Sequence, residues 1–366
     1  MPVRNLSVNA LLRPELFELA TYKVADATGC VKLDAMENPY SWPPDMVAAW
    51  LDKLQYCQPN RYPDPSASAL KRAIISCNNI PPKIEVLLGN GSDEIIQIIL
   101  MAIAGIDVTV VSPEPSFVMY RQIASVLGLK YIGVPLKPDS FQLDMDIMTE
   151  VLATEKPAVI FLAYPNNPTG NLFNQQDVLE ILRIAPGLVV IDEAYAPFAE
   201  ASFMDYLPRF DNLLVMRTVS KLGLAGLRLG FLAGGKAWLE QLDKIRLPYN
   251  INTLTQVSAE FALENFSVFE RQTRSIREDR AKLFTELSRD SRISVYPSQA
   301  NFLLFRVDGF DGTKIFSVLK ENGVLIKDMN PVGGLVKNCL RVTVGTATEN
   351  QQFISEISKA LAVSSR

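Results

Sequence analysis

Hydrophobic residues between positions 84 and 218 recur as short runs, separated by stretches long enough to form helices. Each run is rich in aliphatic residues, and turn-forming Gly, Pro, Asn or Ser residues follow. Strands buried on both faces carry continuous apolar runs of this kind, with helices between them. The pattern therefore predicts an α/β fold with a mainly parallel, doubly wound sheet. The predicted strands are IEVLLG (84–89), VTVVS (108–112), AVIFLAY (158–164), LVVIDEAY (188–195) and LLVMRT (213–218).

The segment after the first predicted strand, NGSDEIIQIILMAIAG, has the features of a helix. Ser92 is expected to cap its first turn, and Gly105 is suited to end it. Asp93 and Glu94 complement the positive end of the helix dipole. Because the segment is apolar nearly all round, we expect this helix to be buried.

The pattern changes near residue 250, where a long polar–apolar helical stretch, SVFERQTRSIREDRAKLFTELS, is followed by shorter alternating strands. This change predicts a second, smaller α+β domain. We therefore expect a large domain at 33–248 and a small C-terminal domain at 249–366. Residues 1–32 are expected to form an N-terminal arm that packs with the small domain or with a partner.

Composition and charge exclude several classes of protein. Of the 366 residues, 48% are hydrophobic and 21% are charged, which is typical of a globular enzyme. The net charge of −4 and the absence of basic runs argue against a nucleic-acid partner. The longest apolar segment, 95–106, is shorter than the roughly 20 residues that cross a membrane. With no signal peptide recognisable, we expect a cytoplasmic protein without a membrane partner.

The residue types that are missing narrow the chemistry further. The chain contains no histidine, so catalytic triads and metal sites that depend on imidazole are excluded. The four cysteines show no Cys-x-x-Cys spacing, which argues against a disulfide framework or a zinc site. No metal is expected. Acid–base chemistry is left to Lys, Tyr, Asp, Glu and Ser side chains.

Polar side chains gather where the predicted strands end. Ligands of open parallel sheets bind beyond the carboxyl ends of the strands. The segments that follow the predicted strands are therefore the candidate site. They are Gly89–Asp93, Pro113–Tyr120, Tyr164–Gly170, Asp192–Tyr195 and Ser220–Arg228.

Two ionisable residues in these segments stand in apolar surroundings. Asp192 ends the strand LVVI, where an unpaired carboxylate is costly, so it needs a cationic partner. A helix cap or a salt bridge would also satisfy it. Lys221 is followed by LGLAGL, where desolvation would lower its pKa toward that of a nucleophilic amine. The alternative is an ordinary solvated surface lysine.

A third group of residues is suited to bind an anion. Arg228 and Ser220, with the free N–H groups at the helix start near Ser92, would form a phosphate cradle. The whole set comprises a reactive lysine, a buried carboxylate for a cationic ring nitrogen, and this cradle. Pyridoxal 5′-phosphate requires all three.

The order and spacing of these residues resemble a known family. Asn167 in NNPTG, Asp192 and Tyr195 in DEAY, Lys221 in SKLGLAGLR and then Arg228 are similar to the class II, fold type I pyridoxal-phosphate aminotransferases. Further motifs resemble, more narrowly, the histidinol-phosphate aminotransferases, and the similarity runs along nearly the whole chain. These motifs are LDAMENPY (33–40), NRYPDP (60–65), GNGSDEII (89–96) and NCLRVTVGT (338–346).

The resemblance implies a role for each catalytic residue. Lys221 would hold the cofactor as an internal aldimine and then move the proton between the substrate α-carbon and C4′. Asp192 would pair with the pyridinium nitrogen and keep it protonated. Asn167 and Tyr195 would donate hydrogen bonds to the ring hydroxyl oxygen.

The resemblance also implies the residues that hold the cofactor phosphate. Ser220, Arg228 and the backbone around Gly91, Ser92 and Asp93 would bind it. Two aromatic residues complete the cofactor site. Phe117 would stack on the ring, and Tyr62 would reach the phosphate from the partner subunit of a homodimer with shared active sites. The alternative for Tyr62 is a core tyrosine beside a proline turn.

Substrate binding is implied for three more residues. Arg341 would clamp the carboxylate of glutamate with its planar guanidinium, although on the alternating strand LRVTV it could instead face water. Tyr22 and Lys327 would help to hold a phosphate on the substrate. Asn167 would also lie next to the substrate.

The implied function is a transaminase that moves an amino group between L-histidinol phosphate and 2-oxoglutarate in histidine biosynthesis. An aromatic amino-acid aminotransferase or a phosphothreonine-type decarboxylase could share the same cofactor cradle. A noncatalytic ligand-binding protein of the same fold is the alternative from a different class. The presence of Lys221, Asp192 and Tyr195 together argues against that last possibility.

Overall fold

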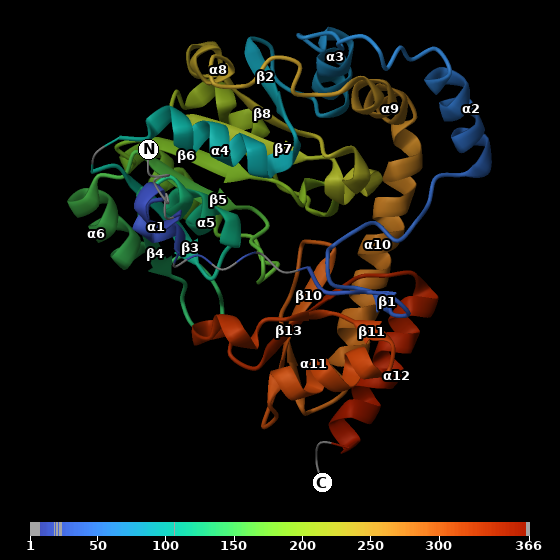
Figure 1. The fold of residues 1–366 in the computed structure, drawn as a ribbon. Helices are drawn as coiled ribbons and strands as arrows, with labels where there is room; N and C mark the ends of the chain where they lie inside the picture. Colours follow the sequence, from blue (N-terminus) through green and yellow to red (C-terminus); the bar gives the residue numbers. More distant parts are fainter. Residues whose placement is uncertain (1–7, 18, 20, 22–23, 106, 364–366) are drawn as a thin grey trace, which may run out of the picture.

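The computed structural model describes residues 8–17, 19, 21, 24–105 and 107–363. Two layered bodies, each with its own sheet, are bridged by the long helix α10 (Phe266–Leu287), which runs from one to the other (Figure 1). Among the described residues, no helix is long and apolar enough to cross a membrane.

The larger body is built on a seven-stranded sheet with the order β2-β8-β7-β6-β5-β3-β4. All neighbouring strands pair in parallel except β8, which lies antiparallel between β2 and β7. The prediction of a mainly parallel, doubly wound sheet is therefore confirmed. The strands are β2 (Ile84–Gly89), β3 (Thr109–Glu114), β4 (Lys130–Pro135), β5 (Val159–Ala163), β6 (Leu188–Asp192), β7 (Leu213–Thr218) and β8 (Gly230–Gly235).

Alternate side chains of each strand point to opposite faces of the sheet. Because both faces are apolar, helices cover both of them. On β5, Ile160 and Leu162 join one hydrophobic core, whereas Val159 and Phe161 join the other. Both cores are sealed from water by helices. The helices of the larger body are α2 (Pro44–Leu54), α3 (Ser68–Cys77), α4 (Gly91–Ile103), α5 (Val118–Val126), α6 (Met145–Glu155), α7 (Gln175–Ile184), α8 (Lys236–Asp243) and α9 (Thr253–Glu264).

Helix α4 is buried largely as predicted, with Ile95, Ile96 and Ile99 inaccessible to water. Its start differs from the prediction. The helix begins at Gly91 with Asn90 as its cap position, and Ser92 lies within the first turn. The expectation that Ser92 caps this helix was wrong, and its backbone N–H instead belongs to the free donors of the helix start.

The smaller body contains an antiparallel sheet with the order β12-β13-β10-β9. Helices α10, α11 (Gly312–Glu321) and α12 (Ala347–Val363) pack around it. The strands are β9 (Ile293–Val295), β10 (Phe302–Val307), β12 (Lys327–Asp328) and β13 (Cys339–Thr343).

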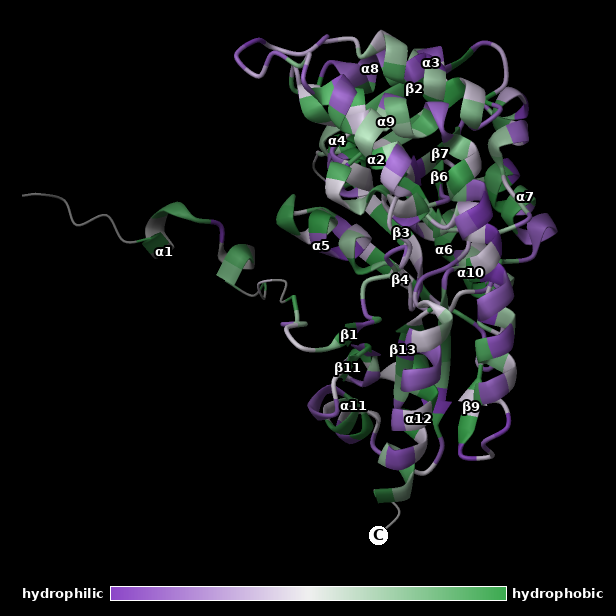
Figure 2. Ribbon diagram, turned by 90° about the vertical axis from the view of Figure 1, so that its right-hand side faces the viewer, coloured by the Kyte–Doolittle hydropathy of each residue, from purple (hydrophilic) through white to green (hydrophobic). Residues whose placement is uncertain are grey.

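The N-terminal part of the chain is tied to the smaller body by a short parallel pair, β1 (Val31–Lys32) with β11 (Val324–Leu325). Before it, the short helix α1 (Val8–Leu11) lies to the side of the molecule and carries exposed apolar residues (Figure 2). The domain limits at 32, 248 and 366 stay predictions.

Candidate active site

The carboxyl ends of the parallel strands border a cavity of about 110 Å³ that the smaller body also approaches. Lys221 follows β7, Asp192 ends β6, and Asn167 lies in the turn after β5. Nine residues predicted from the sequence line this cavity. They are Ser92, Asp93, Phe117, Asn167, Asp192, Tyr195, Ser220, Lys221 and Arg228.

The Lys221 side chain is held at the cavity by a tight helical turn, η4 (Ser220–Leu224). Gly223 in this turn has φ 127°, and a Cβ there would come within 2.9 Å of Asn38 Nδ2, so the turn requires glycine. The Lys221 ammonium donates a hydrogen bond to the carbonyl oxygen of Ala35 at 3.0 Å. Burial, and then the positive charge of Arg341, lower the pKa of Lys221 to about 8. The neutral, nucleophilic amine is therefore far more abundant than in an ordinary lysine.

The Asp192 carboxylate is only 3% exposed, and two donors of the chain bind it. The Tyr120 hydroxyl donates to Oδ2 at 2.6 Å, and the Ala194 N–H donates to Oδ1 at 3.0 Å. Burial raises the pKa of Asp192 to about 6 despite these hydrogen bonds. Within the described part of the chain, no Lys or Arg forms an ion pair with Asp192. The cationic partner expected from the sequence is therefore left to a ligand in the cavity.

Asn167, Tyr195 and Arg341 form one hydrogen-bonded group at the side of the cavity. Asn167 Nδ2 donates to the Tyr195 hydroxyl at 3.1 Å, and Arg341 Nη1 donates to Asn167 Oδ1. Arg341 Nη2 also donates to the carbonyl oxygen of Asp34 at 3.0 Å. Arg341 is only 6% exposed and comes from β13, so it does not face water. The site is thus assembled from both sheets.

Donors for an anion converge at the start of α4. Gly91 has φ 80°, a backbone conformation that favours glycine, and Arg228 Nη2 lies 2.8 Å from the position that a Cβ would take. Arg228 Nη1 donates to Ser220 Oγ at 3.5 Å, and Arg228 Nη2 lies 3.5 Å from Asp93 Oδ2. The N–H groups of the first helical turn have no intrahelical acceptor and carry the positive end of the helix dipole. This arrangement suits a phosphate.

Phe117 lies where the sequence predicts, whereas Tyr62 and Lys327 do not line the cavity. Phe117 borders the cavity with its ring edge-on to Tyr120 at 5.5 Å. Tyr62 lies outside the cavity, is 81% exposed and stacks on Tyr249 at 4.5 Å, which excludes the alternative of a core tyrosine. Lys327 on β12 is directly opposite Arg341 on β13, so both side chains share one face of the small sheet. Tyr22 lies outside the described residues.

The sequence assigned no individual role to several residues at the cavity. Met36, Ala163, Ala194 and Thr218 also line it. Tyr120, which does not line the cavity, donates a hydrogen bond from its hydroxyl to Asp192. Met36 lies in the motif LDAMENPY, but the motif gave it no role of its own. Tyr120 ends the candidate segment Pro113–Tyr120, but nothing in the sequence pairs it with Asp192.

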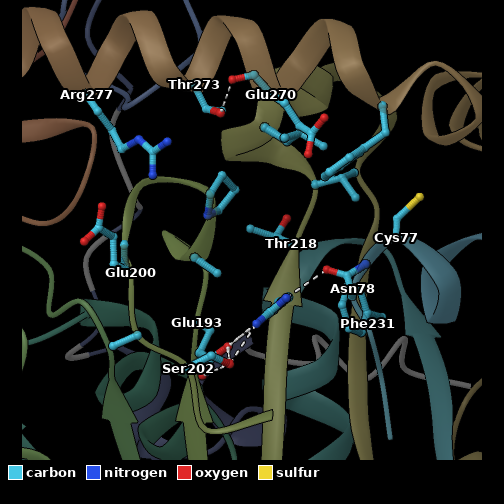
Figure 3. A pocket seen from close by; sticks show the side chains of 18 of the residues that line it. Cys77, Asn78, Glu193, Glu200, Ser202, Thr218, Phe231, Glu270, Thr273 and Arg277 are labelled. Atoms are coloured by element: carbon cyan, nitrogen blue, oxygen red, sulfur yellow. Dashed lines mark hydrogen bonds and ion pairs between the residues drawn. The ribbon is translucent and has the colours of Figure 1, made fainter. Parts of the chain in front are cut away.

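A larger cavity, of about 900 Å³, lies between α10 and the loop after β6. Figure 3 shows Arg277 of α10 projecting into it, and at its base Glu193, Ser202 and Asn78 hydrogen-bonded to an arginine, Arg217. None of the residues to which the sequence assigned a catalytic or binding role lines this cavity. The chemistry of Lys221 therefore belongs to the smaller one, although Thr218 borders both.

The donors in the smaller cavity fit the cofactor expected from the sequence. Asp192 offers a buried carboxylate to a cationic ring nitrogen, and Lys221 offers an amine to an aldehyde. Asn167 and Tyr195 stand beside them with polar groups suited to a ring oxygen. At the other end, the start of α4 and Arg228 offer positive charge to a phosphate. Each of these groups of pyridoxal 5′-phosphate therefore has a matching residue in the described chain.

Comparisons with known proteins show the family of the chain. The profile of the family "Aminotransferase class I and II" matches residues 28–357. The chain is 54% identical to histidinol-phosphate aminotransferase 2 of Nitrosococcus oceani, over 94% of this chain and 96% of that protein. It is 48% identical to histidinol-phosphate aminotransferase 1 of Ralstonia nicotianae, over 96% of this chain and 94% of that one.

A solved structure shows the same fold at lower identity. It is histidinol-phosphate aminotransferase from Sinorhizobium meliloti in complex with pyridoxal 5′-phosphate, with a TM-score of 0.85 at 21% identity. The match covers 97% of this chain and 98% of that one. From the matches along the sequence, this chain belongs to the class I and II aminotransferase family and, within it, to the histidinol-phosphate aminotransferases.

Proposed function

We propose that this protein transfers an amino group between L-histidinol phosphate and 2-oxoglutarate, with pyridoxal 5′-phosphate bound at Lys221. One observation carries the proposal: a lysine whose pKa is lowered to about 8 shares a cavity with a buried carboxylate that has no cationic partner in the described chain. The names of the relatives supply the substrate.

Each catalytic residue has a distinct task. The bound cofactor supplies an electron sink for the carbanion that forms when the substrate α-carbon loses its proton. Lys221 would hold the cofactor through its amine, and Nζ would accept the proton from the substrate α-carbon and return it. Asp192 keeps a positive charge on the ring nitrogen by its own negative charge. Asn167 Nδ2 and the Tyr195 hydroxyl orient the ring through its oxygen.

The residues at the start of α4 anchor the phosphate. The N–H groups of Gly91, Ser92 and Asp93 lie at the positive end of the helix, and Ser220 and Arg228 close the cradle from the other side. Phe117 covers one face of the ring. These contacts orient the cofactor so that Lys221 meets the reacting carbon from a fixed direction.

Substrate anions are drawn to a pair of cations on the small sheet. Lys327 and Arg341 lie directly opposite each other on β12 and β13. Both side chains carry a positive charge, which suits the anionic groups of the two substrates. We assign the carboxylate of glutamate to Arg341 and the phosphate of histidinol phosphate to Lys327, with Tyr22 as a further contact. Asn167 accepts a hydrogen bond from Arg341 and lines the cavity, so it would lie between the cofactor and the substrate.

We also propose that two copies of the chain share their active sites. Tyr62 and Leu247 are 81% and 72% exposed, and Tyr62 stacks on Tyr249. A second copy covering this surface would bury these residues and bring Tyr62 to the phosphate of the neighbouring site. The N-terminal arm, with exposed Val8 and Leu11, is a second surface for the partner. Because the substrates are metabolites, we place the enzyme in the cytoplasm.

A panel of amino donors with 2-oxoglutarate as acceptor tests the proposal. We expect glutamate to form, with kcat/KM for histidinol phosphate at least about tenfold above that for histidinol, because Lys327 and its neighbours bind the phosphate. Equal values would remove phosphate recognition. Preference for aromatic amino acids would favour the aromatic aminotransferase alternative, and release of carbon dioxide without glutamate would favour the decarboxylase. No turnover with any donor would favour a noncatalytic binder.

A further inference from the structure

Tyr120 on α5 is fully buried behind the cofactor cavity and is fixed on two sides. Its ring stacks on Phe161 with centroids 4.7 Å apart, and Phe117 meets it edge-on at 5.5 Å. These contacts fix the ring so that its hydroxyl points toward Asp192 and donates a hydrogen bond to Oδ2 at 2.6 Å. A tyrosine held so rigidly positions its hydrogen-bond acceptor as well.

The surroundings of Asp192 oppose its ionisation. Asp93 on α4 and Glu193, the next residue after β6, are both acidic and raise its pKa, as burial does. Tyr120 and the Ala194 N–H act in the opposite direction by donating hydrogen bonds. Among the described residues, Tyr120 provides the donor for Oδ2, so losing its hydroxyl leaves that buried oxygen without one.

We propose that Tyr120 is a positioning residue, whose hydroxyl keeps Asp192 ionised and aimed at the ring nitrogen of the cofactor. The inference rests on the function proposed above. Tyr120 itself does not border the cavity, so it acts on the cofactor only through Asp192. This role distinguishes it from the neighbouring Phe117, which contacts the cavity directly.

Tyr120→Phe isolates the hydroxyl, since phenylalanine keeps the ring that packs on Phe161. Without the donor, Asp192 would be protonated over a wider pH range and would hold the ring nitrogen less strongly. We expect affinity of the cofactor-free protein for pyridoxal 5′-phosphate to fall about tenfold at pH 7, and kcat to fall about tenfold with KM for the amino donor little changed. The pH at which affinity is half lost on acidification should rise by about one.

The matched control is Tyr131→Phe. Tyr131 on β4 of the same sheet also has a hydroxyl held by a hydrogen bond, to Ser112 Oγ at 2.6 Å, but it does not contact Asp192. We expect its cofactor affinity, pH profile and kcat to match those of the parent. A similar loss in both variants would show a general packing effect and overturn the proposal.

A double-mutant cycle with Asp192→Asn tests whether Tyr120 acts through the acid. In the Asp192→Asn background, adding Tyr120→Phe should weaken cofactor binding by less than about twofold, because the charge that Tyr120 supports is gone. Tenfold losses that multiply would contradict the role. If instead the unmodified protein bound no pyridoxal 5′-phosphate, the proposed function itself would fail. Normal parental binding with an unaffected Tyr120→Phe variant would overturn only the inference about Tyr120.

Discussion

At the scale of single residues, two side chains of the candidate active site lower the stability of the folded protein. Lys221 and Asp192 are both placed where burial disfavours their charged forms, so the pKa of the lysine falls to about 8 and that of the acid rises to about 6. Each group would be more stable in water. When bound, the cofactor would supply an aldehyde to the Lys221 amine and a positive charge to the Asp192 carboxylate. Function and stability therefore compete at these two positions.

Lys221→Met is expected to stabilise the cofactor-free protein. Folding lowers the pKa of Lys221 from 10.5 to about 8, so the unfolded chain binds more protons between these values. The free energy of unfolding of the parent should therefore rise with pH across this interval. At pH 7 the variant should be more stable by about 1–3 kcal/mol, and the difference should shrink toward pH 11. Urea unfolding of both proteins without cofactor measures this. A variant less stable than the parent at pH 7 would contradict the lowered pKa.

At the scale of secondary-structure elements, a buried ion pair joins the ends of β6 and β7, next to the proposed catalytic residues. Glu193 follows Asp192 at the end of β6, and Arg217 lies near the end of β7, before Lys221. Arg217 Nε and Nη2 bind Glu193 Oε2 at 2.9 and 2.7 Å, and the Glu193 side chain has no exposed surface. The pair holds the ends of β6 and β7 in register, and thereby the distance between the acid and the lysine.

Arg217→Met should be strongly destabilising. The substitution leaves a buried carboxylate with only the Ser202 hydroxyl and the Phe203 N–H as donors. We expect a loss of about 3–5 kcal/mol in the free energy of unfolding, measured with urea. The control is Arg183→Met, which removes an exposed pair with Glu180 and should cost less than about 0.5 kcal/mol. Equal effects of the two substitutions would show that burial of the Glu193 pair is unimportant.

The hydrophobic pattern predicted five of the seven strands of the large sheet and missed β4 and β8. All five predicted strands exist, because continuous apolar runs of this kind suit strands whose faces are covered by helices. Strand β4 (130–135) was missed because it lies at the sheet edge and is only partly buried. Strand β8 (230–235) was missed because GFLAGG is rich in glycine, which weakens a strand signal.

At the site, sequence motifs predicted the residues that lie at strand ends. They could not predict contacts between residues that are far apart in the chain. Lys221, Asp192 and Asn167 follow three neighbouring strands, so their convergence follows from the topology alone. The hydrogen bond from Tyr120 to Asp192 joins residues 72 positions apart, and neither residue identifies the other in the sequence. The roles assigned to these residues stay proposals.

At the scale of the whole molecule, the proposed homodimer requires each active site to contain residues of both subunits. Tyr62 is too exposed to serve the cavity of its own chain, and we assign it to the neighbouring site. Tyr62→Ala and Lys221→Ala should then complement each other. After the two proteins are mixed and reassembled, half of the dimers carry both chains, and each of these has one intact site, so about a quarter of all sites should be active.

Steady-state transamination before and after reassembly measures this recovery, with each variant reassembled alone as the control. Activity of the mixture that equals the mean of the two controls would contradict shared sites. A monomer in sedimentation equilibrium would contradict the dimer as well.

The central claim is that Lys221 binds pyridoxal 5′-phosphate covalently through its amine. The most direct test is borohydride reduction of the purified protein after incubation with the cofactor, followed by peptide mapping with mass spectrometry. We expect one pyridoxyl group on the peptide that contains Lys221, and none after Lys221→Ala. Label on other lysines with Lys221 unmodified, or no label and no visible absorption band with added cofactor, would contradict the account.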